Sequence, residues 1–150
     1  MPLNDKYADS LNLYIALNRA GQWINAHADR DIRQHGLNRT EFGVLDLLYH
    51  KGPQPLQQIG GKVLMSSGNI TYVIDKLEKK AFVRRNASTE DRRTIYAEIT
   101  EQGKRFMEQA FPDHAALIDR VLGSLTAEEK TTVSALLIKA GKFAQEEWSK

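Results

Sequence analysis

The middle of the chain constrains its fold more than any other part. Two helical segments separated by only a few residues, 56–63 and a second that ends at about residue 80, form a helix-turn-helix candidate. Two runs rich in β-branched and aromatic residues follow at 82–85 and 94–99, and each is typical of a short strand. The polar loop 86–93 joins them as a hairpin. The sequence therefore predicts a winged helix-turn-helix, in which the hairpin is the wing.

Capping signals mark both ends of the helix that precedes this module. Asn38 and Glu41 are spaced as a capping box, in which each side chain bonds the backbone N–H of the other residue. Leu37 and Phe42 are spaced as the hydrophobic staple that often accompanies such a box. Gly52 follows the last apolar residues of the segment. We therefore expect a helix from about residue 38 to Gly52.

Similar signals place the two helices of the helix-turn-helix. Pro55 suits the first turn of the helix 56–63, because a proline has no N–H to leave unpaired there. Ser66 or Ser67 is expected to cap the second helix, which runs to about Lys80. The inward-facing side chains of that helix recur at helical spacing and are Ile70, Val73, Ile74 and Leu77. One face of the second helix is thereby left polar.

Long amphipathic helices are predicted on both sides of the module. Residues 10–35 carry apolar side chains at intervals of three, four or seven, and Gly36 follows as a stop signal. After the wing, Thr100 is expected to cap a further helix, which Pro112 should kink or break. Thr126 opens the last helix with a second capping box. The first and last helices carry more apolar side chains than a small chain can cover, which predicts a homodimer.

Length and composition are those of one globular domain. The chain has 150 residues, of which 41% are hydrophobic and 27% are charged, so a core can form without covalent staples. It has no cysteine, which excludes disulfides, thiolate metal sites and thiol redox sensing. No apolar run approaches the roughly 20 residues of a membrane span, and the first residues lack a signal-peptide pattern. We therefore expect a cytoplasmic protein with no membrane partner.

The charged residues are unevenly distributed. The net charge is only +2, but the segment 62–105 holds ten Lys or Arg against six Asp or Glu, and the rest of the chain holds eleven against thirteen. A basic middle between acidic ends is expected if one face of the protein meets phosphate. A solvated surface with chance clustering would give the same numbers, so charge alone does not identify the partner.

The same region resembles the MarR-type (multiple antibiotic resistance regulator) winged helix-turn-helix repressors. The resemblance is carried by residues 70–80 (ITYVIDKLEKK), 83–85 (VRR), 90–93 (EDRR) and 99–103 (ITEQG). The order of elements fits the family over essentially the whole chain. Residues 68–75 (GNITYVID) are also similar to the branch of the family that represses quinone- and catechol-detoxification genes.

This resemblance implies a fold that is mainly α with a small β-hairpin wing. It implies a single domain over 1–150, with a DNA-binding lobe at 37–99 and dimerisation helices at 5–35 and 100–148. The symmetric dimer would place two recognition helices in successive major grooves of a pseudo-palindrome. No cofactor is expected. One position departs from the family, because Ala81 stands where members usually have the glycine of a left-handed helix cap.

Polar and basic side chains of the second helix and the wing are expected to contact double-stranded DNA. Asn69 is the first choice for a base contact, since an amide can pair bidentately with adenine, although Asn69 could equally support only the helix start. Asp91 is expected to orient an arginine of the wing, and either Arg92 or Arg93 to enter the minor groove. The other candidates for base or phosphate contacts are Ser66, Ser67, Thr71, Tyr72, Lys76, Arg84, Arg85 and Lys62.

The resemblance further implies a small aromatic or phenolic effector, bound between the DNA-binding lobe and the dimer helices. Six side chains are candidates to line such a crevice, namely Trp23, His27 and Arg30 on the first helix and Phe42, Asp46 and Tyr49 on the second. These residues also have an ordinary explanation, because an aromatic side chain at helical spacing usually belongs to the core.

Three other kinds of protein fit the sequence less well. A metal-responsive regulator needs convergent ligands, and of four scattered histidines only His114, beside Asp113, is a candidate. A winged helix that binds protein in place of DNA would be expected to lose its basic wing, which this chain keeps. An enzyme is not expected, because the sequence has no Gly-rich phosphate loop, no nucleophile elbow and no paired carboxylates at a recognisable spacing.

Overall fold

The computed structural model describes residues 5–63 and 69–150. The fold is mainly helical with a small antiparallel sheet, which confirms the predicted fold class. The elements are the helices α2 (Ala8–Gln34), α3 (Arg39–Lys51), α4 (Leu56–Lys62), α5 (Ile70–Lys79), α6 (Glu101–Val121) and α7 (Ala127–Trp148), and the strands β1 (Gln54–Pro55), β2 (Val83–Ala87) and β3 (Ile95–Ile99). None of the described helices is both long enough and apolar enough to cross a membrane.

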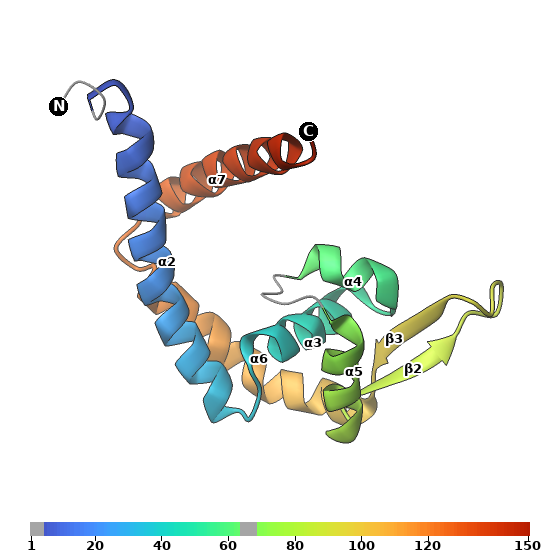
Figure 1. The fold of residues 1–150 in the computed structure, drawn as a ribbon. Coiled ribbons are helices and arrows are strands. Elements are labelled where there is room, and N and C mark those ends of the chain that lie inside the picture. Colours follow the sequence, from blue (N-terminus) through green and yellow to red (C-terminus); the bar gives the residue numbers. More distant parts are fainter. Residues whose placement is uncertain (1–4, 64–68) are drawn as a thin grey trace.

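The helices form a lobe with two long arms. Helix α3 packs against α2, α5, α6 and β3, so it lies at the centre of the lobe. Figure 1 shows α2 and α7 as arms that leave this lobe, while the hairpin of β2 and β3 projects from its other side. No residue of α7 is buried. Among the described residues of the single chain, the C-terminal helix therefore has little to pack against.

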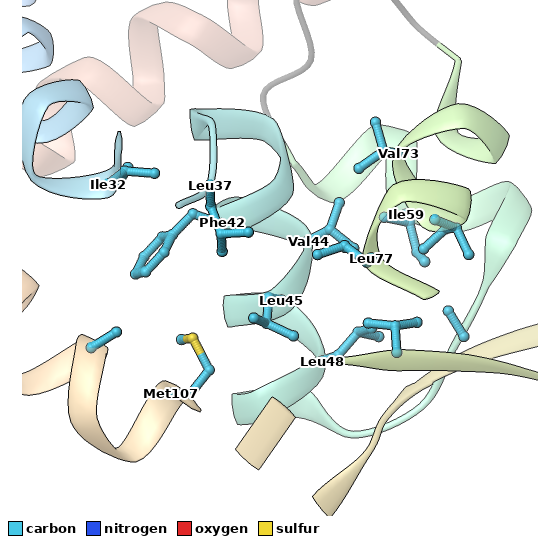
Figure 2. Close-up of a cluster of buried hydrophobic side chains, with 14 residues drawn as sticks. Ile32, Leu37, Phe42, Val44, Leu45, Leu48, Ile59, Val73, Leu77 and Met107 are labelled. Carbon is cyan, nitrogen blue, oxygen red and sulfur yellow. The ribbon is translucent and has the colours of Figure 1, made fainter. Parts of the chain in front are cut away.

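The core lies between α3 and the elements around it. Phe42, Leu45 and Leu48 of α3 are almost completely buried. Figure 2 shows Leu45 and Phe42 on the side of Met107 from α6, and Val44 of α3 beside Leu77 of α5 and Ile59 of α4. Burial of this many large apolar side chains, each worth about 1.5–3 kcal/mol, is the main force that holds the helices together.

The sheet has one more strand than the sequence predicted. Its order is β1-β3-β2, and both pairs are antiparallel. The hairpin pairs Val83 with Ile99 and Ala87 with Ile95, so β2 continues two residues beyond the predicted strand 82–85. The additional strand β1 pairs Gln54 with Ala97. A two-residue strand shows no alternation in the sequence, which is why it was missed.

Most predicted helix ends are confirmed by their hydrogen bonds. At the start of α3, Oδ1 of Asn38 accepts the N–H of Glu41 at 2.8 Å, and Oε1 of Glu41 accepts the N–H of Asn38 at 3.0 Å. The box of Thr126 and Glu129 forms in the same way at the start of α7. Thr100 caps α6, because its hydroxyl accepts the N–H of Gly103 at 3.0 Å.

The predicted cap of α5 is wrong, and of the two outcomes predicted at Pro112 a break does not occur. Asn69 caps α5, with its Oδ1 at 3.4 Å from the N–H of Tyr72, whereas Ser66 and Ser67 lie outside the described residues. Pro112 does not break α6, which continues through it to Val121. A proline removes only one intrahelical hydrogen bond, and buried side chains such as Met107 and Ala110 hold the helix against the core.

Candidate nucleic-acid interface

Helix α5 has one face in the core and one in solvent. Val73, Ile74 and Leu77 are buried, because they recur at the spacing that keeps side chains on one side of a helix. On the other face Thr71 is exposed, and Tyr72 is 58% exposed. The Nζ of Lys76 lies 4.9 Å from the centroid of the Tyr72 ring, a cation–π contact on the solvent side. The exposed face of α5 therefore carries hydroxyl, aromatic and ammonium groups.

The predicted base-contact residue Asn69 has a structural role at the same place. Its side-chain oxygen accepts the N–H of Tyr72 and so satisfies one free donor of the first turn of α5. Asn69 itself is exposed to solvent. Its NH₂ group is the part of the side chain that the cap does not use.

The two adjacent arginines of strand β2 lie on opposite faces of the wing. Arg84 is 63% exposed and pairs with Glu98, the residue opposite it on β3. The side chain of Arg85 is only 27% exposed and reaches acidic residues of α5, since Nη2 lies 2.8 Å from Oδ1 of Asp75 and Nη1 donates to Glu78. The pleat of β2 explains the difference, because successive side chains of a strand lie on opposite faces.

The loop at the tip of the wing is ordered by its own polar groups. The hydroxyl of Ser88 accepts the backbone N–H of Glu90 and of Asp91. Oδ1 of Asp91 accepts the backbone N–H of Arg93 at 3.0 Å and lies 3.4 Å from its Nε. The side chain of Arg93 is nevertheless 94% exposed, and Arg92 beside it is also exposed. Asp91 thus contacts Arg93, through one carboxylate oxygen.

These placements put the described candidates for DNA contact on two neighbouring elements, with the exception of Lys62, which lies on α4 and donates from Nζ to Oε1 of Gln54 at 2.6 Å. Helix α5 packs against β2, so its exposed face and the wing belong to one side of the lobe. The exposed candidates there are Asn69, Thr71, Tyr72, Arg84, Arg92 and Arg93, and Lys76 is half-buried beside Tyr72. Figure 1 shows the hairpin extending well beyond the end of α5. A helix with a polar face and a projecting basic hairpin can enter a major and a minor groove together.

A cavity of about 710 Å³ lies beside this module, between α2, α3, the end of α4 and α6. Of the six predicted ligand residues, Phe42 and Asp46 line it. The other four do not. Trp23 is 66% exposed, and Nη2 of Arg30 contacts Nδ1 of His27 at 3.4 Å on the surface of α2. Tyr49 packs its ring edge against His50.

The cavity wall also contains residues that the sequence did not single out for it. They are Asn25, Ala28, Ile32, Arg39, Gly43, Leu47, His50, Lys51, Lys62, Val63 and His114. Arg39 is held by Asp29 of α2, with Nε and Nη2 at 2.8 and 2.7 Å from the two carboxylate oxygens. These hydrogen bonds hold the pKa of Asp29 below its usual value and raise that of Arg39.

His114 contacts an acidic residue of another helix. Its Nδ1 lies 3.0 Å from Oδ2 of Asp31 on α2, and its ring packs on Phe42. The sequence predicts His114 and the preceding residue, Asp113, only as candidate metal ligands. In the part of the chain that the structure describes, no group of three or more His, Asp or Glu residues is placed to hold a metal ion. His114 therefore joins α6 to α2.

Comparison with known proteins identifies the family. A sequence model of the MarR family matches residues 37–95. The chain is 52% identical over 137 residues to the HTH-type transcriptional regulator MhqR of Bacillus subtilis, covering 91% of this chain and 94% of MhqR.

Solved structures agree at the level of the fold. Sco3205, a MarR family transcriptional regulator from Streptomyces coelicolor solved in complex with DNA, superposes with a TM-score of 0.81 at 18% identity, over 90% of this chain and 87% of that one. BpsR of Bordetella bronchiseptica superposes with a TM-score of 0.75 at 23% identity, over 84% of this chain and 90% of BpsR. With the MhqR identity and the family match, these findings show that the chain belongs to the MarR family and is a DNA-binding transcriptional regulator.

Proposed function

We propose that the protein is a homodimeric repressor that binds a pseudo-palindromic operator and is released from it by a small aromatic or phenolic ligand. The observation that carries the proposal is the solvent-facing side of α5 beside a basic, ordered wing, in a chain 52% identical to MhqR. Asn69, Thr71, Tyr72 and Lys76, with Ser66 and Ser67 before them, read bases and phosphates in the major groove. Arg84 contacts phosphate, and Arg92 or Arg93 enters the minor groove at the wing tip.

Dimerisation through the arms is supported by their uncovered apolar side chains. On α7, Leu136 is 59% exposed and Phe143 is 64% exposed, and both belong to one stripe with Val133 and Leu137. The N-terminal half of α2 likewise exposes Leu13 at 55%. Exposed apolar area on this scale favours association with a second copy of the chain. The domain division at 5–35, 37–99 and 100–148 follows, with the outer segments as dimerisation helices.

Light scattering coupled to size-exclusion chromatography measures the molar mass of the protein and so tests the proposed dimer directly. Leu136→Glu puts a charge in the apolar stripe of α7 and is expected to shift the protein toward the monomer mass. Lys142→Glu is the matched control, because it adds negative charge on the opposite side of the same helix. A monomeric wild-type protein, or equal effects of the two changes, would contradict a dimer held by this stripe.

The cavity between α2, α3 and α6 is the proposed effector site. Its wall combines the ring of Phe42 with cationic Arg39 and Lys51, groups that suit an aromatic ring bearing an acidic hydroxyl or carboxylate. BpsR offers a precedent, since its DNA binding is regulated by 6-hydroxynicotinic acid. Among the predicted residues, Trp23, His27, Arg30 and Tyr49 would contact such a ligand only after rearrangement or from a partner subunit.

The experiment that tests DNA recognition is selection of bound duplexes from a random pool at near-physiological salt. An inverted repeat with half-site centres about 10 bp apart is the expected result. Arg93→Ala should weaken binding to the selected duplex and make the dependence on salt shallower by about one ion. Recovery of salt-sensitive but unselected DNA would refute sequence-specific regulation. Recovery of no DNA would favour a winged helix that binds protein.

Release by a ligand is then measured on the selected duplex. Hydroquinone, catechol and 6-hydroxynicotinic acid are titrated into the complex, and the apparent Kd for DNA is expected to rise with at least one of them. Phe42 and Asp46 are both in the wall of the cavity, so Asp46→Ala should change the ligand concentration needed for release while the Kd without ligand stays the same. Unchanged DNA affinity with every compound would contradict ligand-released repression.

A further inference from the structure

Arg85 has a different environment from the other arginines of the wing. Its side chain is 27% exposed, against 63% for Arg84 and 94% for Arg93. The register of the hairpin is the cause. Arg85 pairs across the sheet with Ala97, which is completely buried, so both residues lie on the side of the hairpin that packs on the lobe.

The guanidinium of Arg85 joins the wing to two turns of α5. Nη2 lies 2.8 Å from Oδ1 of Asp75 and donates to the carbonyl of Thr71 at 3.3 Å, while Nη1 donates to Oε1 of Glu78. Thr71, Asp75 and Glu78 are spaced four and three residues apart, so they line one face of the helix. A planar fork with several fixed donors can contact all three, which a single ammonium group cannot do.

The two carboxylates lie on the helix that approaches DNA. Asp75 is 52% exposed and Glu78 is 34% exposed. Near phosphate each would repel the nucleic acid, because like charges in contact with solvent still interact over about one Debye length, roughly 8 Å at physiological salt. The positive charge of Arg85 offsets one of these two negative charges, and its guanidinium contacts both carboxylates.

We propose that Arg85 is a positioning residue for DNA recognition. It holds the wing at a fixed orientation to α5 and screens Asp75 and Glu78 from the phosphates, and it is not itself a phosphate contact. The inference rests on the proposed function, in which α5 and the wing bind DNA together. The orientation matters because the two elements must meet neighbouring grooves at once, so loss of the link should cost sequence discrimination more than general affinity.

Arg85→Lys distinguishes a positioning residue from a phosphate contact. Lysine keeps the charge and is a good phosphate ligand, but it lacks the fork. The measured quantity is the ratio of affinities for the selected duplex and for a scrambled duplex of equal length, over a series of salt concentrations. For a positioning residue the ratio falls on the order of tenfold, the usual effect of losing hydrogen bonds to a charged group, and the salt slope stays the same. For a phosphate contact, Arg85→Lys leaves the ratio unchanged.

Arg120→Lys is the matched control, because it makes the same change at an exposed arginine in the last turn of α6, outside the proposed DNA-binding residues. Its ratio should stay within about twofold of wild type. A second series tests the screening of the carboxylates. Arg85→Ala alone should lower the affinity for the scrambled duplex. Adding Asp75→Asn and Glu78→Gln to Arg85→Ala should restore that affinity but leave the ratio of affinities low. If that triple variant recovers no affinity, the carboxylates do not repel DNA and the screening role is wrong.

The free protein supplies a readout that needs no DNA. Amide hydrogen exchange in β2 and β3 should be faster in Arg85→Lys than in wild type and unchanged in Arg120→Lys, because only the former loosens the hairpin from α5. Unchanged exchange together with an unchanged ratio would overturn the positioning role. Wild-type protein that binds neither duplex would overturn the proposed function before any variant is measured, while the exchange result would still report on the link between wing and helix.

Discussion

Ala81→Gly should raise the free energy of unfolding, because Ala81 adopts a backbone conformation that favours glycine. Its φ is +65°, and among the described residues other than glycine no further one has a positive φ. The residue closes a Schellman motif at the end of α5. The N–H of Ala81 bonds the carbonyl of Glu78 at 2.9 Å, and that of Phe82 bonds the carbonyl of Leu77 at 3.0 Å.

The end of α2 contains the same motif with the usual residue. Gly36 has φ +85°, its N–H bonds the carbonyl of Arg33 at 3.0 Å, and the N–H of Leu37 bonds the carbonyl of Ile32 at 3.3 Å. A Cβ built on Gly36 would meet no atom within 4 Å. Any effect of Gly36→Ala on stability therefore comes from the backbone conformation and not from a clash.

The magnitude follows from two opposing contributions. A left-handed conformation costs an L-residue about 1–2 kcal/mol, which Ala81→Gly removes. Glycine gives the unfolded chain more freedom, which costs about 0.4–1 kcal/mol. The side chain of Ala81 is exposed, so its loss removes little buried area. The net stabilisation is about 0.5–1 kcal/mol, or a rise in Tm of about 1–4 °C for a domain of this size.

The assay is urea unfolding of wild type, Ala81→Gly and Gly36→Ala at one fixed protomer concentration, since association shifts the apparent stability. Ala81→Gly should move the midpoint up and Gly36→Ala should move it down by a similar amount. A lower midpoint for Ala81→Gly, with the expected loss for Gly36→Ala, would show that alanine carries no strain at this cap. Equal shifts in one direction would refute the idea that the two motifs are equivalent.

Two further changes probe the base of the wing and the wall of the cavity. Gly103→Ala would place a Cβ at 2.3 Å from the carbonyl oxygen of Phe82, so we expect the free energy of unfolding measured in urea to fall by several kcal/mol. Gly61→Ala is the control, because its Cβ would meet no atom within 4 Å, and it should be neutral or slightly stabilising. Asp29→Asn should lower stability at pH 7 by less than about 1 kcal/mol, because Arg39 stabilises the ionised carboxylate. Because the pKa of Asp29 is lowered, the stabilisation by the ionised carboxylate is present above about pH 4 and is lost as pH falls through the folded pKa. The stabilities of wild type and Asp29→Asn should therefore converge in acid. A constant difference between them down to about pH 2 would contradict this expectation.

Local signals in the sequence located most helix ends. The capping box of Asn38 and Glu41 and the stop at Gly36 depend on contacts within four or five residues, so spacing alone reveals them. The cap of α5 was assigned to the wrong residues because Ser66, Ser67 and Asn69 are all good caps and lie within four positions of one another. Spacing does not choose among adjacent candidates.

Contacts between distant elements were not readable in the same way. The cavity wall joins residues such as Asn25, Arg39 and Lys62, which no single helical period relates. The pair of Asp31 and His114 spans 83 positions, and no pattern in the sequence relates two residues so far apart. The role of Arg85 depends on the register of the hairpin, which sets which of two adjacent arginines faces α5.

Helix α6 connects the cavity to the base of the wing. Near its start, the ring of Phe106 stacks on Phe82, with ring centroids 4.6 Å apart, and Phe82 directly precedes β2. Eight residues further on, a distance of about 12 Å along a helix, His114 lines the cavity and contacts Asp31 of α2. Because α6 is continuous through Pro112, these contacts belong to one helix. In the proposed mechanism, a ligand that separates α6 from α2 would therefore act on the wing through α6, and release from DNA would need no unfolding of the lobe.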